Sequence, residues 1–150
     1  MALSADGRTL YPAIEGALIA DTDQRRRMIN EFDLRTKRYT GRTWQYRTED
    51  PRWLIGDFTA LDSHRFVVIE RDDFQGAQPD LFKRIYVIDL REVGPDGFLV
   101  KRPVLDLMRI RDPRGITTAA PGWIGLGDPF SFPLQSVESV LPLRGGRLLV

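Results

Sequence analysis

Acidic residues recur at matched positions of this 150-residue sequence, and they are its best candidates for chemistry. Asp57 precedes the apolar run FTAL, and Glu138 precedes the comparable run SVLPL. If both runs are the first strands of equivalent units, the two carboxylates face one shared channel. Carboxylate oxygens are preferred ligands of Ca²⁺, which takes about six to eight of them. The spacing therefore predicts a Ca²⁺ site at the mouth of such a channel.

A second acidic group lies where the second strand of each unit is expected to end. It contains Glu15 in the string AIEG, and Glu70, Asp72 and Asp73 in the string IERDDFQG. Adjacent carboxylates need a cation, a basic partner or water to offset their mutual repulsion. Ion pairing with neighbouring arginines such as Arg71 is the alternative to metal binding. The predicted metal ligands are Asp57, Glu70, Asp72 and Glu138.

Two basic residues, Lys83 and Arg84, begin the string KRIYVIDL and are the predicted contacts for an anionic substrate group such as phosphate. A solvated strand end is the alternative for this pair. The only histidine, His64, lies in an expected turn, and no G-x-S-x-G string is present, so no Ser-His-Asp triad is expected. The absence of cysteine excludes a thiol nucleophile. Catalytic residues stay unassigned.

The charge balance and the lengths of the apolar runs argue against nucleic acid binding, a membrane span and a signal peptide. The 22 Lys and Arg residues almost cancel the 21 Asp and Glu residues, so no general field attracts nucleic acid. No run approaches the length of about 18 apolar residues that a membrane span requires, so no membrane span is expected. The first residues, MALSADGRTLY, lack both a basic segment and an apolar segment, and we expect no signal peptide in this chain.

The elements that must position these side chains are short strands, because apolar residues rarely recur at helical spacing. A hairpin is expected around the turn Ala5 to Gly7, with its tip set by an Asp-Gly pair. The polar segment 35–41, which ends in Gly41, is expected to be a loop. Further strands are predicted over 26–34, 42–49, 54–61, 65–71, 83–90 and around 98–108.

Three hairpins resemble one another along the chain: MALSADGRTLY, FTALDSHRFVV and ESVLPLRGGRLLV. Each has an apolar run, a polar turn, an arginine and a second apolar run, which is typical of propeller blades. The predicted fold is all-β: an incomplete β-propeller segment of about two antiparallel four-stranded blades plus a hairpin. The predicted units are 1–50, 54–108 and a truncated 134–150. A self-contained antiparallel sandwich of eight to ten strands is the alternative.

A Pro- and Gly-rich connection is predicted over 111–133, and its Trp123, Ile124, Phe130 and Phe132 are expected to pack at one end of the sheets. The sequence opens inside one apolar strand pattern and stops inside another, at Arg147 to Val150. We therefore expect a segment of a longer protein or a truncated reading frame.

Several of these strings resemble, in order, the phytase-like domain family, described as having esterase-like activity of phytase. They are MALSADGRTLYPAIEGAL, IGDFTALDSHRFVVIERDDFQG, FKRIYVIDL and FPLQSVESVLPLRGGRLLV. The resemblance covers essentially the whole chain and is most specific over the IERD-loop-FKRIYVIDL block and the VESV hairpin. It implies a secreted or periplasmic bacterial parent protein with a longer propeller domain.

The resemblance also implies cation-assisted hydrolysis of a small-molecule ester or phosphate ester, with carboxylates as ligands. Asp57, Glu70, Asp72 and Glu138 match acidic positions of the resembling strings. As a fragment lacking other blades, the isolated chain is expected to be inactive. The alternative function is a non-catalytic propeller that binds a ligand or protein at the channel mouth, and a non-functional fragment is a third possibility.

Overall fold

The computed structural model describes residues 1–76, 80–117 and 127–150. Within these ranges the chain contains ten strands and no helix. The strands are β1 (Ala2–Leu3), β2 (Thr9–Tyr11), β3 (Arg26–Asp33), β4 (Arg38–Arg47), β5 (Leu54–Ala60), β6 (Arg65–Arg71), β7 (Lys83–Val93), β8 (Leu99–Asp106), β9 (Leu141–Leu143) and β10 (Arg147–Leu149).

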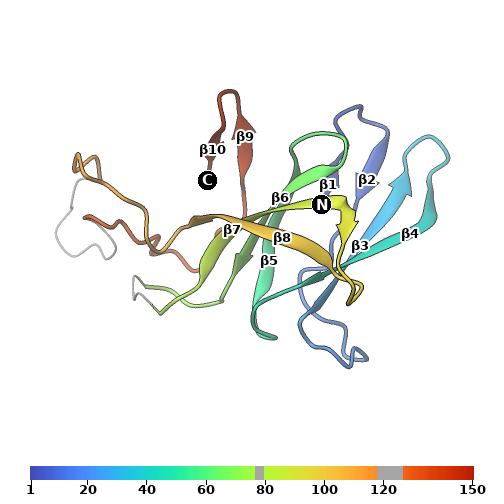
Figure 1. Ribbon diagram of the computed structural model, residues 1–150, viewed down its shortest axis with the longest axis horizontal. Coiled ribbons are helices and arrows are strands. Elements are labelled where there is room, and N and C mark those ends of the chain that lie inside the picture. The colour runs from blue at the N-terminus through green and yellow to red at the C-terminus, as the bar shows by residue number, and fades with distance from the viewer. Residues whose placement is uncertain (77–79, 118–126) are drawn as a thin grey trace.

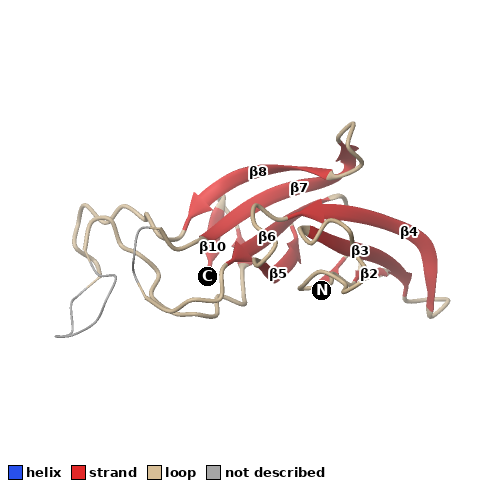
Figure 2. Cartoon of the chain, turned by 90° about the horizontal axis from the view of Figure 1, so that it is seen from below, coloured by secondary structure: helices blue, strands red, loops and turns tan. Residues whose placement is uncertain are grey.

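These strands form three antiparallel sheets that follow one another along the chain. The orders are β1-β2-β3-β4, β5-β6-β7-β8 and the hairpin β9-β10. Figure 1 shows the sheet β5–β8 between the sheet β1–β4 and the hairpin β9–β10. Figure 2 shows the strands of the two larger sheets from below, with loops joining their ends. The predicted all-β class with four-stranded antiparallel sheets is confirmed, and the arrangement is consistent with part of a propeller.

The first hydrophobic core lies between the two four-stranded sheets. Strand β3 places Ile29 in it, because alternate residues of a strand face the same side of the sheet. The rings of Tyr11 from β2 and Phe66 from β6 meet edge to face at 5.0 Å. The indole Nε1 of Trp44 donates a hydrogen bond of 2.8 Å to the carbonyl oxygen of Leu90 in the neighbouring sheet. The two sheets are therefore joined by apolar packing and by a directed polar contact.

The second core covers the opposite side of the sheet β5–β8. Val67, Ile69 and Ile85 point to this side and contact Val137 and Val140, which precede the hairpin β9–β10. Leu105, Ile110, Phe132 and Leu148 pack around this cluster. The hairpin is therefore attached to its neighbouring sheet by apolar contacts of the kind that join propeller blades.

The structure differs from the expected elements at Gly41. This glycine lies inside β4, with a φ of 88°, beside a register shift between Asn30 and Phe32 of β3. The hairpin turn instead includes Lys37, which has a φ of 54°. The expected loop end at Gly41 is therefore wrong, because a glycine with a positive φ occurs in turns and in bulges alike.

Part of the predicted connection 111–133 can be compared with the structure. Phe130 pairs with Ile110 in an isolated bridge, and the ring of Phe132 lies 6.5 Å from that of Phe130. Phe132 therefore packs against the sheet, as expected, whereas Trp123 and Ile124 lie outside the described residues. No helix among the described residues is long and apolar enough to cross a membrane.

Candidate functional site

The side chain of Arg71, the last residue of β6, is at the centre of a group of carboxylates. It is only 4% exposed. Its Nη1 donates hydrogen bonds to Asp73 Oδ1 at 3.0 Å and to the carbonyl oxygen of Asp72 at 3.1 Å. Its Nη2 donates to Glu15 Oε1 at 3.4 Å and to Glu138 Oε1 at 3.2 Å. One buried guanidinium thus holds three carboxylates.

These carboxylates come from three different parts of the fold, and we call Arg71, Glu15, Asp73 and Glu138 the acidic rim. Glu15 follows β2, and its carbonyl oxygen accepts a hydrogen bond from the amide of Ile55 at the start of β5. Asp73 follows β6, and Glu138 precedes β9. Of these three acids, only Glu138 is among the metal ligands predicted from the sequence, and Arg71 is the partner expected if the acids form ion pairs instead. The feature of the sequence that could have indicated this role is the position of Arg71 between two acids, Glu70 and Asp72, at the end of an apolar strand.

The acidic rim carries more negative than positive charge. Its three carboxylates are 59%, 57% and 60% exposed, and they surround one guanidinium. Among the described residues, hydrogen bonds reach only one oxygen of each, namely Glu15 Oε1, Asp73 Oδ1 and Glu138 Oε1. Hydrogen bonds from Gln135 and then from Arg71 lower the pKa of Asp73, so this carboxyl stays ionised. Because these side chains are more than half exposed, solvent or a cation can reach the carboxylates.

The side chains of the rim are not arranged as a preformed metal site. In the described part of the chain, no three Asp, Glu or His side chains are arranged to hold one ion. The three carboxylates instead share the guanidinium of Arg71. The donor type still suits a hard cation such as Ca²⁺.

The predicted ligand Asp57 lies in β5, and it positions the third unit. Its Oδ2 accepts a hydrogen bond of 2.8 Å from the amide of Val140 and another of 3.1 Å from the hydroxyl of Thr59. Val140 is two residues beyond Glu138. Asp57 therefore holds the segment that carries one acid of the rim, and cation binding by Asp57 itself stays a prediction.

The predicted ligand Asp72 and the predicted substrate contact Lys83 form a buried ion pair. Lys83 Nζ lies 2.8 Å from Asp72 Oδ1, and neither side chain is more than 3% exposed. Asp72 Oδ2 also accepts the amide of Phe82 at 2.8 Å, and Lys83 Nζ donates to the carbonyl oxygen of Phe74 at 3.0 Å. These contacts fix the loop that begins with Asp73, and the buried pair therefore helps to position this acid of the rim.

The predicted ligand Glu70 lies between the two large sheets and is fully buried. Its Oε2 accepts hydrogen bonds from the Tyr46 hydroxyl at 2.6 Å and from Lys101 Nζ at 2.7 Å. Its Oε1 accepts the amide of Glu49 at 2.6 Å. Desolvation, together with the adjacent Glu70 charge, raises the pKa of Tyr46 well above its usual range. These three contacts join β6 to β8 and to the end of β4.

Arg84, the other predicted substrate contact, is partly exposed. Its Nε lies 3.4 Å from Asp106 Oδ2 on β8, and its guanidinium carbon lies 4.7 Å from the ring centre of Phe82. Because neighbouring residues of a strand point to opposite faces, Arg84 and Lys83 do not act on one ligand from the same side. Contact between Arg84 and a substrate stays a prediction.

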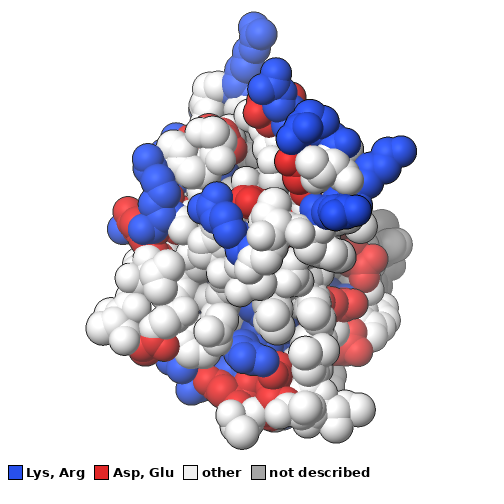
Figure 3. Space-filling model, turned by 90° about the vertical axis from the view of Figure 1, so that its right-hand side faces the viewer, with Lys and Arg blue, Asp and Glu red and all other residues white. Residues whose placement is uncertain are grey.

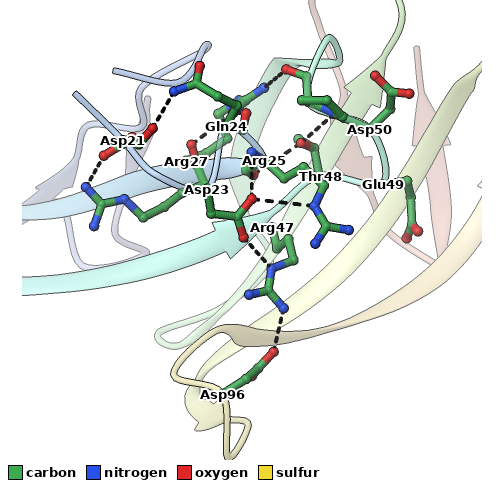
Figure 4. Close-up of polar contacts among 12 residues, drawn as sticks. Asp21, Asp23, Gln24, Arg25, Arg27, Arg47, Thr48, Glu49, Asp50 and Asp96 are labelled. Carbon is green, nitrogen blue, oxygen red and sulfur yellow. Dashed lines mark hydrogen bonds and ion pairs between the residues drawn. The ribbon is translucent and has the colours of Figure 1, made fainter. Parts of the chain in front are cut away.

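A second polar cluster surrounds Arg47 at the end of β4 (Figure 4). Its Nε lies 3.1 Å from Asp23 Oδ2, its Nη1 lies 2.8 Å from Asp96 Oδ2, and its guanidinium carbon lies 3.6 Å from the ring centre of Phe98. A groove of about 490 Å³ runs beside it and also contacts Arg25. The arginines here have carboxylates beside them, so the groove offers no surplus charge to a ligand.

A serine, a histidine and an aspartate meet at the tip of the β5–β6 hairpin. Ser63 Oγ lies 2.9 Å from His64 Nδ1, but His64 Nε2 lies 3.7 Å from Asp89 Oδ2, which is too long for a hydrogen bond. Asp89 instead accepts two side-chain hydrogen bonds from Arg91, which lower its pKa to about 2. This tip is at the opposite end of β6 from Arg71. The geometry therefore lacks the oriented histidine of a triad.

The fold and the site together define an all-β protein of packed antiparallel sheets with a carboxylate rim at one end. The chain belongs to the phytase-like family, described as esterase-like activity of phytase, whose family model matches residues 1–150. Neither a curated protein nor a solved structure matches the chain. Membership of this family places the chain among hydrolase-like proteins of the phytase type.

Proposed function

We propose that this chain contributes to hydrolysis of a small-molecule ester or phosphate ester with a divalent cation, Ca²⁺ being the first candidate, bound at the acidic rim. One observation carries the proposal: three carboxylates from three parts of the fold are held on Arg71 through one oxygen each. Their second oxygens and their surplus negative charge suit a hard cation. Water or substrate oxygens would complete its coordination shell.

A cation bound there would supply electrostatic stabilisation of a negatively charged reacting group. The residues of the chain orient the rim. Arg71 sets the spacing of Glu15, Asp73 and Glu138, and Asp57 holds the segment before β9 through the amide of Val140. Hydrolysis is proposed to need further propeller units beside these 150 residues, in a protein that acts outside the cytoplasm. The partial-propeller arrangement supports the first point, and family membership supports the second.

Calorimetric titration of the chain with Ca²⁺ tests the proposal directly. We expect saturable binding that is weakened at least about tenfold by Glu138→Gln or Glu15→Gln. Glu92→Gln is the matched control, because Glu92 is a partly exposed acid of β7 whose partner, Arg102, lies away from the rim. Equal binding by all four proteins, or no binding by the unaltered chain, would contradict the cation site.

Hydrolysis of p-nitrophenyl acetate and p-nitrophenyl phosphate by a protein that contains this chain and its remaining units tests the second step. We expect activity that a chelator removes and that Ca²⁺ restores, and we expect Ser63→Ala to leave it unchanged. Activity that persists in chelator but is lost in Ser63→Ala would favour the hairpin tip instead. Ca²⁺ binding without any hydrolysis would favour the non-catalytic binding module.

A further inference from the structure

Each of the three sheets begins with a hairpin that carries an arginine at the same place. Arg8, Arg65 and Arg147 follow the turns of the hairpins β1–β2, β5–β6 and β9–β10, and all three are exposed. Arg65 belongs to the sheet β5–β8, which has a neighbour on either side, and its side chain is still 55% exposed. The arginine after the turn is therefore open to solvent even in a sheet that is flanked on both sides.

The tip of the hairpin β3–β4 adds three more cations. Arg35 and Lys37 lie in its turn, Arg38 begins β4, and all three are exposed. The amide of Leu34 donates a hydrogen bond of 3.0 Å to the carbonyl oxygen of Arg8, so the two hairpin tips of the first sheet are in contact. A hollow of about 630 Å³ between these tips is lined in part by Arg8 and Arg35.

Two acids also line this hollow, and each is bound to the backbone of its own turn. Asp6 Oδ1 accepts a hydrogen bond of 3.1 Å from the amide of Arg8, and Asp33 Oδ1 accepts one of 2.8 Å from the amide of Thr36. Neither carboxylate pairs with a guanidinium or an ammonium group of the described residues. The cations of the hollow therefore remain available to an anion from outside.

The four tips together carry a surplus of positive charge, and we call them the basic end. Counted with the strand residue on either side of each turn, they comprise residues 3–9, 33–38, 60–65 and 143–147. These segments hold seven Lys or Arg residues and three Asp residues, a surplus of four, whereas the whole chain has a formal net charge of +1. Within the described residues, Arg65 alone among the seven cations makes an ion pair, with Asp62.

The tips lie at one end of the molecule. Figure 1 shows the turns of β1–β2, β3–β4, β5–β6 and β9–β10 along its upper edge. Figure 3 has the same vertical direction, and Lys and Arg side chains predominate at its upper end. The turn of β7–β8 lies away from this edge, and its Asp96 pairs with Arg47. Because Arg71 ends β6 whereas the β5–β6 turn precedes it, the acidic rim and the basic end lie at opposite ends of that strand.

We propose that the basic end docks on a membrane surface that contains anionic phospholipids. Lys and Arg side chains close to such a surface are attracted to its headgroup phosphates. Cations spread over four tips at one end can reach a flat array of phosphates together, whereas one small anion or one polymer strand would contact only a few of them. Each further unit with the same hairpin pattern would add an arginine to this end. Docking leaves the acidic rim facing solvent and does not depend on a cation bound there.

Co-sedimentation of the chain with lipid vesicles tests the docking. We expect binding to phosphatidylcholine vesicles in which about a third of the lipid is phosphatidylglycerol, and none to phosphatidylcholine alone. Salt at about 0.5 M should release the chain, because it screens charges at exposed surfaces. The double variant Arg35→Gln with Arg38→Gln should bind at least about fivefold more weakly, as should Arg144→Gln with Arg147→Gln.

The matched control is the double variant Arg109→Gln with Arg114→Gln. It removes the same charge from exposed positions after β8, whose last residue, Asp106, pairs with Arg84 at the start of β7 and so lies at the rim end of the sheet. We expect its vesicle binding to stay within about twofold of the unaltered chain. Circular dichroism verifies that every variant keeps its strands.

A fluorescent label gives the orientation, since the chain has no cysteine of its own. A polarity-sensitive dye on Thr36→Cys, at the basic end, should shift its emission to the blue when vesicles are added. The same dye on Gln75→Cys, which is exposed two residues after Asp73, should not shift. Three outcomes would overturn the proposal: equal binding to both kinds of vesicle, equal weakening by the control variant, and tighter binding to double-stranded DNA or heparin than to the anionic vesicles.

Discussion

The hydroxyl of Tyr46 on β4 donates a hydrogen bond of 2.6 Å to Glu70 Oε2 on β6, and it thereby joins two sheets through their buried interior. Lys101 Nζ reaches the same oxygen at 2.7 Å. The Glu70 charge is therefore paired, whereas the tyrosine hydroxyl must remain protonated to donate. Two sheets that meet mainly through apolar side chains thus also share one hydrogen-bonded network.

Tyr46→Phe tests this network. Near neutral pH we expect a loss of about 1–2 kcal/mol in the free energy of unfolding, because the Lys101 and Glu49 contacts to Glu70 remain. Urea denaturation gives this value, with Tyr39→Phe as the control, since the Tyr39 ring is 64% exposed. An unchanged midpoint would contradict a role for the hydroxyl in joining the sheets.

The raised pKa of Tyr46 predicts that the chain loses stability at alkaline pH. Desolvation raises the pKa of Tyr46 well above 10.0, and it raises the pKa of Tyr86 to about 12. The folded chain therefore keeps protons that the unfolded chain releases above about pH 10. Stability is fully present below that pH and falls as the pH rises through the folded-state values. Urea midpoints from pH 8 to 11 should fall less steeply in Tyr46→Phe, and a parallel fall would contradict the assignment.

Arg71→Lys tests the centre of the acidic rim. A lysine keeps the charge but cannot reach Glu15, Asp73 and Glu138 from one planar fork. We expect a loss of about 1–3 kcal/mol in the free energy of unfolding, discounted because the three carboxylates are more than half exposed. Arg52→Lys is the control, because its pair with Asp50 is local and exposed. Equal losses of unfolding free energy in Arg71→Lys and Arg52→Lys would contradict a central role of Arg71 in the acidic rim.

Gly56→Ala tests how closely the third unit approaches the middle sheet. A β-carbon at Gly56 would lie 2.2 Å from the carbonyl oxygen of Val137 and 3.2 Å from Ile69 Cγ2. Backbone must move to admit it, so we expect a loss of about 1–3 kcal/mol in the free energy of unfolding. Gly16→Ala is the control, since its nearest neighbour, Leu54 Cδ2, would lie 4.0 Å away. Thermal unfolding that shifts equally in both variants would contradict the close approach.

Trp44→Phe tests the polar contact between the first two sheets. The substitution removes the indole donor and leaves the carbonyl oxygen of Leu90 without its 2.8 Å partner in a buried place. We expect a loss of about 1–3 kcal/mol in the free energy of unfolding, from this unpaired group and from the smaller ring. Guanidinium unfolding measures it. A loss below about 0.5 kcal/mol, which is usual for surface positions, would show that the contact adds nothing.

Much of the fold could be predicted because alternation along short strands is a local signal. The hairpin turn at Asp6 and Gly7 was expected, and Gly7 has a φ of 69°. Gly41 could not be assigned from the sequence because glycines with a positive φ occur in turns and in bulges, and only the pairing of β3 with β4 distinguishes the two. Pairing is a contact between distant residues, and a local pattern does not contain it.

The candidate site was less predictable than the fold. The strings around Glu70 and Asp72 indicate where acids gather, but they do not say which side chain turns inward. Alternation buries Glu70 against Tyr46, and Lys83 captures Asp72, while Asp73 turns outward. The contacts of Arg71 with Glu15 and Glu138 depend on the docking of three sheets, which no short string encodes.

The reach of Arg71 also makes the acidic rim a late event in folding. Its contacts with Glu15 and Glu138 span 56 and 67 residues of sequence, whereas each hairpin closes over a few residues. Such long-range contacts form only after the sheets that carry them have been built. If the sheet β1–β4 or the hairpin β9–β10 detaches, the rim loses Glu15 or Glu138, whereas the sheet β5–β8 stays folded. The rim is therefore an internal reporter of complete assembly, since its charge pattern exists only while all three units are docked.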